Sequence, residues 1–177
     1  GLILTQEQIK LGHEVDVFIG FGDRNILPNI RKAPLNFLPM YSKIRRFWFN
    51  FWVLRQVKKH HRENPYDVIH LHGDFIESYF GGKLSKKLGI PAVLTIHAGL
   101  NKNLLKPENT RYFSGVKKII CVSEEIAKSL EIIGVSRDKI SVISSGIYLD
   151  EFKKENGEIA AIKNQYSKPI IISIGVL

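Results

Sequence analysis

Short apolar runs alternate with helix-like segments along most of the chain, and this alternation constrains the fold more than any other feature. Residues 92–96 are an apolar run, and residues 67–72 are predicted as a strand from Val68, Ile69 and Leu71. The segment between them, 75–88, has apolar residues at helical spacing and ends at Gly89, which Pro91 follows. Two strands joined by such a helix are parallel, with a right-handed crossover. Continuous apolar strands are typical of a sheet covered by helices on both faces, so we predict a doubly wound parallel α/β domain.

The same pattern predicts the other elements. Further strands are expected over residues 15–19, 35–38, 118–122, 140–143 and 170–174. Further helices are expected up to Gly12, over residues 42–63, from 109 to 114, and after Ser123 as far as Gly134. Residues 28–34 are predicted to be a loop, and residues 151–167 a helix or connector.

Ligands of open parallel sheets bind outside the carboxyl ends of the strands. The residues at the predicted ends are Gly20, Gly22, His72, Gly73, His97, Gly99, Ser123, Ser145 and Gly146. Each also has a purely structural interpretation: His72 could bond a loop carbonyl, Ser123 could serve only as a helix cap, and Gly146 could serve a turn. His70 is interpreted as a core residue. No carboxylate or cysteine stands at ligand spacing from these histidines, so no metal site is predicted.

Several classes of protein are excluded by what the sequence lacks. It has no complete Gly-x-Gly-x-x-Gly opening a helix, no Walker loop, no Gly-x-Ser-x-Gly and no Cys-x-x-Cys. The single Cys121 excludes an internal disulfide and fits a reducing compartment. No apolar stretch is long enough to span a bilayer as a helix.

Five short segments together resemble a known family. They are Gly12-His-Glu-Val15, Asp67-Val-Ile-His-Leu-His72, Thr95-Ile-His-Ala98, Ile120-Cys-Val-Ser-Glu124 and Val142-Ile-Ser-Ser-Gly-Ile147. Their order and spacing resemble the GHEV, DVIHxH, TxHG, IxVSE and VIPNGVD segments of glycosyltransferase family 4. The resemblance implies the GT-B fold, in which two Rossmann-like domains face a cleft. It also implies transfer of a sugar from a nucleotide-sugar donor to a glycan or lipid-linked acceptor, with retention of configuration and without a metal or other cofactor.

The resemblance also implies a domain assignment. Residues 1–167 resemble the N-terminal, acceptor-side domain without its first strand and Gly-Gly loop, and residues 168–177 resemble the first strand of the donor domain. A chain of this extent is expected to be inactive alone. His97 is the implied catalytic residue, beside the reacting sugar, where a neutral imidazole suits developing positive charge. The implied substrate-binding residues are His72, Gly73, Gly99, Ser123, Glu124, Ser145 and Gly146. Ser145 and Tyr148 replace the Asn and Asp of the family segment, so those two roles are not carried over.

The positive charge is concentrated in one segment. The formal net charge is +9, and residues 24–62 hold ten basic residues and no acidic one. Within residues 42–62 the basic side chains are interleaved with aromatic ones, which is typical of a helix that binds an anionic membrane surface. The predicted membrane contacts are Arg45, Arg46, Trp48, Phe49, Trp52, Lys58 and Lys59. Such an enzyme would be cytoplasmic and peripheral on the inner face of the membrane.

Other interpretations of this segment and of the whole chain stay open. Ile44, Phe47, Phe51, Leu54 and Val57 could form the core-facing stripe of an ordinary helix, with the charges solvated or attracting an anionic acceptor. A non-enzymatic α/β module could use the segment to bind nucleic acid, although this would not explain the five family segments. Another GT-B activity, such as a sugar-nucleotide epimerase or a phosphorylase, is a further alternative.

Overall fold

The computed structural model describes residues 2–21, 29–35, 39 and 43–146 of the 177-residue chain. Contacts divide the chain into two units, residues 1–145 and 146–177, and all the elements below belong to the first unit. The domain boundary predicted after residue 167, the segment 151–167 and the strand predicted at 170–174 lie outside the described residues.

The described strands form two parallel sheets. A two-stranded sheet pairs β1 (Val17–Ile19) with β2 (Ile30–Lys32). A four-stranded sheet has the order β3 (Ile69–His72), β4 (Ala92–Ile96), β5 (Lys118–Cys121) and β6 (Ile140–Val142). Every described pairing is parallel, as the alternation of strands and helices predicts. The strands do not form one continuous sheet, however, because no backbone ladder joins β1 to β3 in the described part of the chain.

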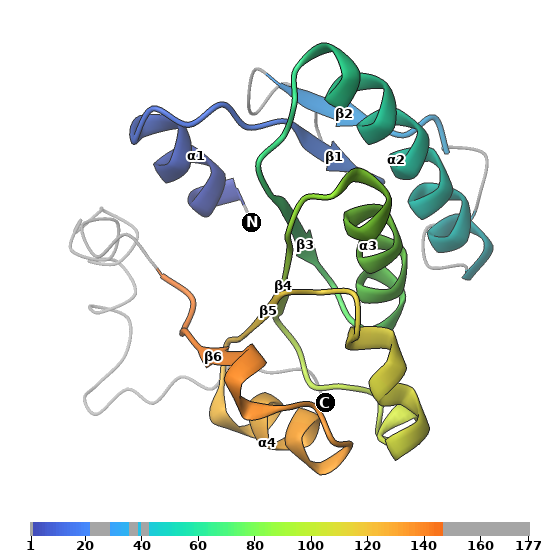
Figure 1. Ribbon diagram of the computed structural model, residues 1–177, viewed down its shortest axis with the longest axis vertical. Helices are drawn as coiled ribbons and strands as arrows, with labels where there is room; N and C mark the ends of the chain where they lie inside the picture. Colours follow the sequence, from blue (N-terminus) through green and yellow to red (C-terminus); the bar gives the residue numbers. More distant parts are fainter. Residues whose placement is uncertain (1, 22–28, 36–38, 40–42, 147–177) are drawn as a thin grey trace, which may run out of the picture. The chain divides into compact units, whose positions relative to one another are not determined.

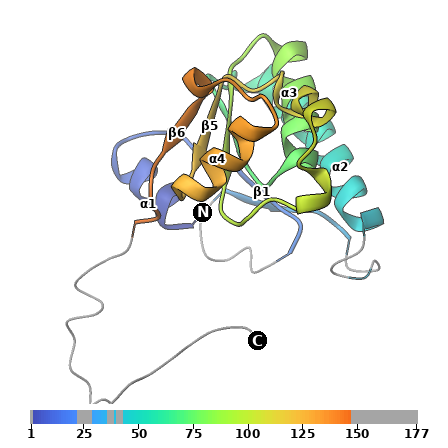
Figure 2. The ribbon, with the colours of Figure 1, turned by 90° about the horizontal axis from the view of Figure 1, so that it is seen from below.

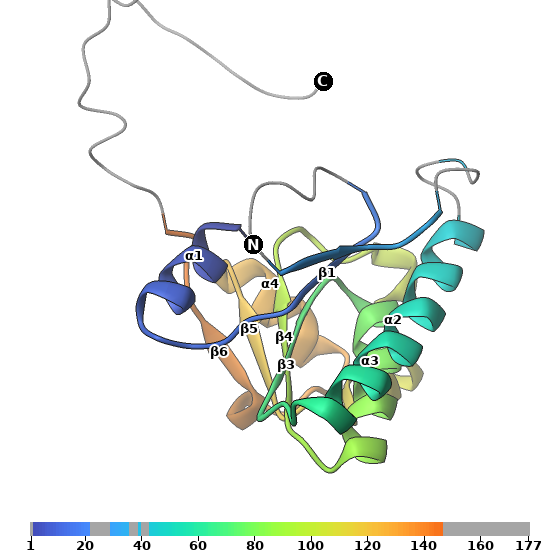
Figure 3. The ribbon, with the colours of Figure 1, turned by 90° about the horizontal axis from the view of Figure 1, so that it is seen from above.

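Helices lie on both sides of the strands. The α-helices are α1 (Leu2–Lys10), α2 (Lys43–Glu63), α3 (Phe75–Leu88) and α4 (Glu124–Ile132). Short 3₁₀ helices are η1 (Lys102–Leu104), η2 (Pro107–Phe113) and η3 (Arg137–Lys139). In Figures 1 and 3, α1 lies on the side of the strands opposite to α2 and α3, which run next to each other. The predicted doubly wound α/β arrangement is therefore confirmed.

The predicted boundaries hold best where strong end signals flank an element. The structure has α3 and β4 at the predicted residues, and Gly89 ends α3 in the left-handed conformation. The prediction around residues 28–38 is wrong: Ile30–Lys32, assigned to a loop, is β2. Its pairing with β1 explains the difference, because Val17 opposite Ile30 is a contact that local sequence does not encode. Residues 36–38 of the strand predicted there lie outside the described residues.

The main core lies between the four-stranded sheet and the helices α3, η2 and α4. Alternate residues of β4 and β5 point into it, and Leu94, Ile96, Ile119 and Cys121 are at most 1% exposed. Figure 2 shows α4 against β5 and β6, where Leu130 completes the same cluster. Burial raises the pKa of the Cys121 thiol to about 11, so this cysteine is a packing residue.

Candidate functional site

The register of the four-stranded sheet brings its carboxyl ends to one edge. His72 is opposite Thr95 in the β3–β4 pair, and Ile96 is opposite Cys121 in the β4–β5 pair. His97 and Ser123 therefore leave neighbouring strands at the same edge, as predicted from the topological rule for parallel sheets. The carboxyl end of β6 follows them, because the N–H of Ile143 donates to the carbonyl of Cys121.

Two of the predicted residues are in direct contact. His72 Nδ1 lies 2.8 Å from His97 Nε2, within hydrogen-bond distance, and the two ring planes are within 16° of parallel with centroids 5.1 Å apart, so the rings meet edge to edge through this bond. His72 is the last residue of β3, and His97 directly follows β4. The pair therefore bridges two adjacent strands where their backbone pairing ends.

A second pair lies directly behind the first. His70 Nε2 is 2.8 Å from the hydroxyl of Thr95, and the His70 ring stacks on His72 with centroids 4.5 Å apart. These residues share one face because side chains alternate along a strand. Leu71 contacts Gly81 of α3, so His70 and His72 face away from α3. His70 is half-buried and hydrogen-bonded, as its interpretation as a core residue implies, and it also contacts the ring of His72. Histidines two residues apart in one strand, beside Thr-x-His in the next, are the sequence signal for this arrangement.

The environment keeps these imidazoles neutral. Burial, reinforced by the neighbouring rings of His70 and His97, lowers the pKa of His72 to about 4. Burial also lowers the pKa values of His70 and His97 below their ordinary range. At neutral pH the cluster therefore offers hydrogen-bond donors and acceptors and carries no charge.

Carboxylates occupy the start of α3 next to the histidines. Asp74 caps the helix, and Glu77 bonds back to the N–H of Asp74, which completes a capping box. Arg46 of α2 donates to both carboxylates, from Nη2 to Asp74 Oδ1 at 2.7 Å and from Nε to Glu77 Oε1 at 2.7 Å. The N–H of Gly73 is also used, because it donates to the carbonyl of Thr95. This helix start is therefore filled by side chains of the protein.

The other predicted substrate-binding residues lie on exposed or partly exposed chain. Ser123 caps α4 by accepting a hydrogen bond from the N–H of Ile126. Glu124, Gly99, Ser145 and Gly146 are exposed. Gly146 belongs to the second unit, which starts at that residue. The structure shows direct contact only for His72 and His97 among the predicted set, and a ligand role for the others stays a prediction.

The inward face of α2 corrects part of the predicted membrane set. Arg45 is 8% exposed and donates to the carbonyl of Gly20 at 2.7 Å. Arg46 is held by Asp74 and Glu77, as described above. Phe49 packs on Gly20, and Trp52 packs edge-on against Phe18 of β1. Arg45 is buried, so its assignment as a membrane contact is wrong. Arg46, Phe49 and Trp52 make internal contacts but are partly exposed, so their membrane role stays a prediction.

The outward face of α2 has a simple composition. Ile44, Phe47, Trp48 and Phe51 are exposed, so the interpretation of Ile44, Phe47 and Phe51 as core residues is also wrong, although Val57 is buried. Helical spacing continues this exposed face through three basic residues, Arg55, Lys59 and Arg62, which are exposed as well. Lys58 lies at its margin, half-buried, where desolvation and Lys87 lower its pKa. After Lys43, which is also exposed, the outer surface of α2 is therefore aromatic over its first half and basic over its second.

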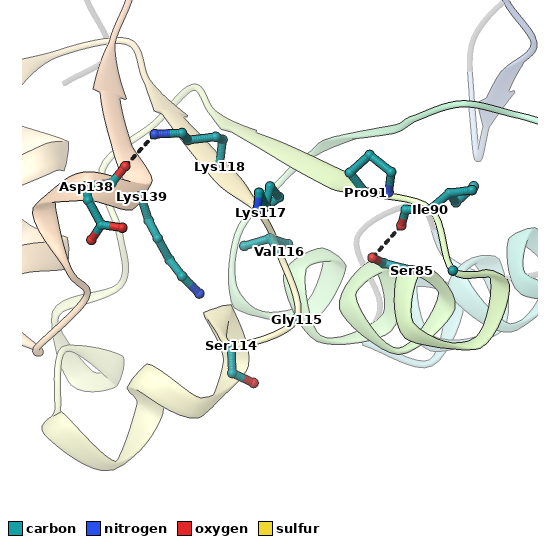
Figure 4. Close-up of a pocket in the computed structure, with 11 residues that line it drawn as sticks. Ser85, Ile90, Pro91, Ser114, Gly115, Val116, Lys117, Lys118, Asp138 and Lys139 are labelled. Carbon is teal, nitrogen blue, oxygen red and sulfur yellow. Dashed lines mark hydrogen bonds between the residues drawn. The ribbon is translucent and has the colours of Figure 1, made fainter.

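A cavity of about 610 Å³ lies at the other edge of the sheet (Figure 4). Pro91 and Lys117, which border it, precede β4 and β5, so it opens at the amino ends of these strands. Lys118 donates to the carbonyl of Asp138 there. We do not assign this cavity as the site, because ligands of parallel sheets bind at the carboxyl ends.

The part of the chain that the structure describes offers neither a metal-ligand cluster nor a membrane-spanning helix. No group of three or more His, Cys, Asp or Glu side chains in this part of the chain is arranged to hold a metal ion. None of the helices described here combines the length and apolar character needed to cross a bilayer.

Comparison with known sequences gives one family. The family model of Glycosyltransferase Family 4 matches residues 2–151, which is most of the chain. No curated protein matches the sequence.

Comparison with solved structures gives the fold. A structure of Anabaena Alr3699/HepE in complex with UDP and glucose has a TM-score of 0.61 at 16% identity, over 93% of this chain and 46% of that one. The apo form of the lipopolysaccharide outer core galactosyltransferase WaaB has a TM-score of 0.56 at 17% identity, over 82% and 40%. A Listeria monocytogenes structure, provisionally assigned as a UDP-N-acetylglucosamine 2-epimerase, has a TM-score of 0.53 at 18% identity, over 78% and 38%. The chain thus spans less than half of each of these structures.

Proposed function

The chain belongs to glycosyltransferase family 4, and on this premise we propose that it forms the acceptor-side domain of a retaining glycosyltransferase in which His97 is the catalytic residue. The observation that carries the proposal is the neutral, hydrogen-bonded His97 at the carboxyl end of β4, in a domain with the Rossmann-like GT-B fold. The predicted segment Thr95–Ala98 places this residue within the family pattern.

The chemistry of sugar transfer suits a neutral imidazole. Positive charge develops at the anomeric carbon as the bond to the leaving phosphate breaks, and a cation beside it would oppose this charge. An uncharged ring can instead hydrogen-bond a sugar hydroxyl and hold the sugar in place. The lowered pKa of His97 favours this uncharged form at neutral pH.

We propose a nucleotide sugar as the donor. Structures of Anabaena HepE, to which this chain is similar in fold, were determined with UDP and with UDP-glucose. Because the chain spans less than half of those structures, we propose that the donor pocket belongs to a second domain and that the 177 residues alone do not catalyse transfer. His72, Gly73, Gly99, Ser123, Glu124, Ser145 and Gly146 are the residues we propose to line the substrate cleft.

We propose a glycan or lipid-linked sugar as the acceptor, presented at an anionic membrane on the cytoplasmic side. The support is the outward face of α2, where Trp48 and Phe51 adjoin Arg55 and Lys59. Aromatic rings settle at the lipid interface, and each basic residue near an anionic surface contributes about 1 kcal/mol of attraction. We further propose that transfer needs no divalent metal.

Transfer by the protein that joins this chain to a donor-binding domain tests the proposal. We expect the protein to release UDP from a UDP-sugar only when a lipid-linked acceptor is present. An α-linked donor should give an α-linked product, and EDTA should leave the rate unchanged. His97→Ala should lower kcat by at least about 100-fold, as the loss of one group that stabilises the transition state does. Lys102→Gln, at an exposed position on η1, serves as the matched control.

A different product would identify the alternative activity. Conversion of UDP-N-acetylglucosamine to its 2-epimer without an acceptor would assign the protein to the epimerases and contradict our proposal. The similarity in fold to the Listeria monocytogenes structure is the reason to assay epimerisation beside transfer. Unchanged transfer by His97→Ala would reject the role of His97.

A further inference from the structure

The four polar side chains at the ends of β3 and β4 form two rungs between the strands. His70 bonds Thr95 in the inner rung, and His72 bonds His97 in the outer one, each at 2.8 Å. The His70 ring stacks on the His72 ring at an interplanar angle of 27°, and the His72 and His97 rings lie edge to edge at 16°. The inner rung is anchored, because Thr95 is 6% exposed and pairs with β3 through the backbone.

The outer rung contains His97, which the backbone holds less firmly than it holds the other three residues. Both residues are exposed, but His97 follows the last residue of β4, whereas His72 is still inside β3. A side chain on such a segment has free rotation about its χ angles unless another group fixes it. The hydrogen bond with His72 supplies this constraint on His97.

The bond also distinguishes the two nitrogens of the His97 ring. Nε2 of His97 is engaged with Nδ1 of His72, so Nδ1 of His97 is the nitrogen left for a ligand. In a neutral pair one of the two bonded nitrogens carries the proton and the other accepts it. The direction of this hydrogen bond therefore decides whether Nδ1 of His97 is a donor or an acceptor.

We propose that His72 is a positioning residue, which fixes the ring orientation and the tautomer of His97 through the Nδ1···Nε2 hydrogen bond, and that the His70–Thr95 rung holds His72 in place. This deepens the proposed function and rests on it in one respect, that Nδ1 of His97 faces the sugar. An orienting partner of this kind acts on the catalytic step because the wrong tautomer presents the wrong group to the substrate. It goes beyond the family segments, which place His72 only among substrate-binding residues.

Two substitutions of His72 separate the hydrogen bond from the presence of a ring at this position. His72→Asn keeps a polar side-chain atom near the position of Nδ1, and His72→Phe keeps a ring and loses the hydrogen bond. His13→Phe is the matched control, because His13 is exposed and lies after α1. The dispersion of the amide spectrum and the Tm of each variant report whether it is folded.

Nitrogen-15 shifts of the His97 ring in the 177-residue chain test the positioning directly. We expect one protonated and one unprotonated nitrogen in the unsubstituted chain, in His72→Asn and in His13→Phe, and two averaged shifts in a folded His72→Phe. A single unchanged tautomer of His97 in folded His72→Phe would overturn the proposal. So would averaged shifts in the unsubstituted chain.

Kinetics with the donor-binding domain attached test the consequence. His72→Phe should lower kcat by about 10- to 100-fold with little change in the KM for the donor, and His72→Asn should recover most of the loss. Equal losses in the two variants would overturn the positioning role. If His97→Ala retains full transfer, the proposed role of His97 fails, whereas the ring shifts still report whether His72 fixes its tautomer.

Discussion

At the scale of single residues, the histidines of β3 are bases that folding keeps neutral. Burial and neighbouring rings lower the pKa of His72 to about 4, and burial lowers that of His70, whereas both have ordinary values in the unfolded chain. Between pH 6.5 and about 4 the unfolded chain therefore binds more protons than the folded one. The free energy of unfolding must fall as the pH falls through this window.

We expect the free energy of unfolding to fall by about 1 to 2 kcal/mol between pH 7 and pH 5. One pKa unit corresponds to about 1.4 kcal/mol, and the partial exposure of His72 reduces the contribution of this residue. Urea unfolding at several pH values in this range measures it. His72→Phe should flatten the profile, and His13→Phe, at an exposed position, should not. A flat profile in the unsubstituted chain would show that the histidines titrate as they do in the unfolded state.

The sequence predicts part of this cluster for a physical reason. His72 and His97 stand where apolar runs end, so they could be placed at the edge of a parallel sheet without a structure. The contacts of His70 could not, because they depend on the register that puts His72 opposite Thr95. Register is set by the packing of whole strands, which a local pattern does not specify.

At the scale of elements, α3 is seated by a close glycine contact. A Cβ added to Gly82 would lie 2.8 Å from Cα of Gly115, which precedes β5, so backbone meets backbone at this point. Alanine favours a helix interior over glycine by about 1 kcal/mol, but this contact cannot relax by moving a side chain. We expect Gly82→Ala to lower the free energy of unfolding by about 1 to 2 kcal/mol net.

Denaturant unfolding of Gly82→Ala measures this balance. Gly99→Ala is the control, because a Cβ there would meet nothing within 4 Å. The control should change the free energy of unfolding by less than about 0.5 kcal/mol. A stabilised Gly82→Ala would mean that the helix can move away from Gly115 at little cost.

Arg46 joins α2 to the start of α3. Burial alone would raise the pKa of Glu77, but the hydrogen bond and the charge of Arg46 outweigh it and hold this pKa below its usual range. Removing the arginine leaves the mostly buried Glu77 carboxylate without its cationic partner. We expect Arg46→Ala to cost about 1 to 3 kcal/mol of the free energy of unfolding at pH 7.

The double substitution Arg46→Ala with Glu77→Gln provides the check. Its loss should be smaller than the sum of the two single losses, because the second change removes the unpaired charge. Arg55→Ala, on the exposed face of the same helix, is the control and should have little effect on stability. Additive losses in the cycle would show that the contact contributes no coupling energy.

The faces of α2 show where prediction from sequence stops. The length of this helix follows from its end signals, Asn64 and Pro65, and the structure agrees. Its orientation does not follow, because apolar side chains occur all around it and no single stripe dominates. Phe18 and Gly20 of the β1 region decide which aromatic residues turn inward, and these are tertiary contacts.

At the scale of the whole molecule, the charge excess lies apart from the histidine cluster. The chain outside residues 24–62 holds 16 basic and 17 acidic residues, so it is close to neutral. Within the basic segment, Arg45 and Arg46 make internal contacts, and the outward charge of α2 comes from Lys43 at its start and from its second half. The surface that could attract an anionic partner is therefore the outer face of this helix, with Trp48 and Phe51 at one end of it.

Because the charge lies apart from the histidine cluster, vesicle binding can be tested for its dependence on the outer face of α2 rather than on the net charge of the chain. We expect the chain to sediment with vesicles of mixed neutral and anionic lipid at low salt, and the bound fraction to fall as salt screens the attraction. The triple substitution Arg55→Gln, Lys59→Gln and Arg62→Gln should weaken binding about 100-fold, at roughly 1 kcal/mol for each charge. Trp48→Ala with Phe51→Ala should weaken it at high salt as well, since burial of an aromatic side chain is not screened.

The matched control removes the same number of charges from another part of the surface. Lys102, Lys106 and Lys128 are exposed and lie outside the basic segment, so their replacement by Gln lowers the net charge equally. If overall charge governs binding, both triple variants lose the same affinity, and the surface of α2 has no special role. Because attraction between exposed charges decays within about 10 Å at 0.1 M salt, charges removed from a surface that contacts lipid must lower the affinity more than charges removed from a remote surface.

Strong binding of the chain to single-stranded RNA with the same salt dependence would instead favour a nucleic-acid partner for this helix.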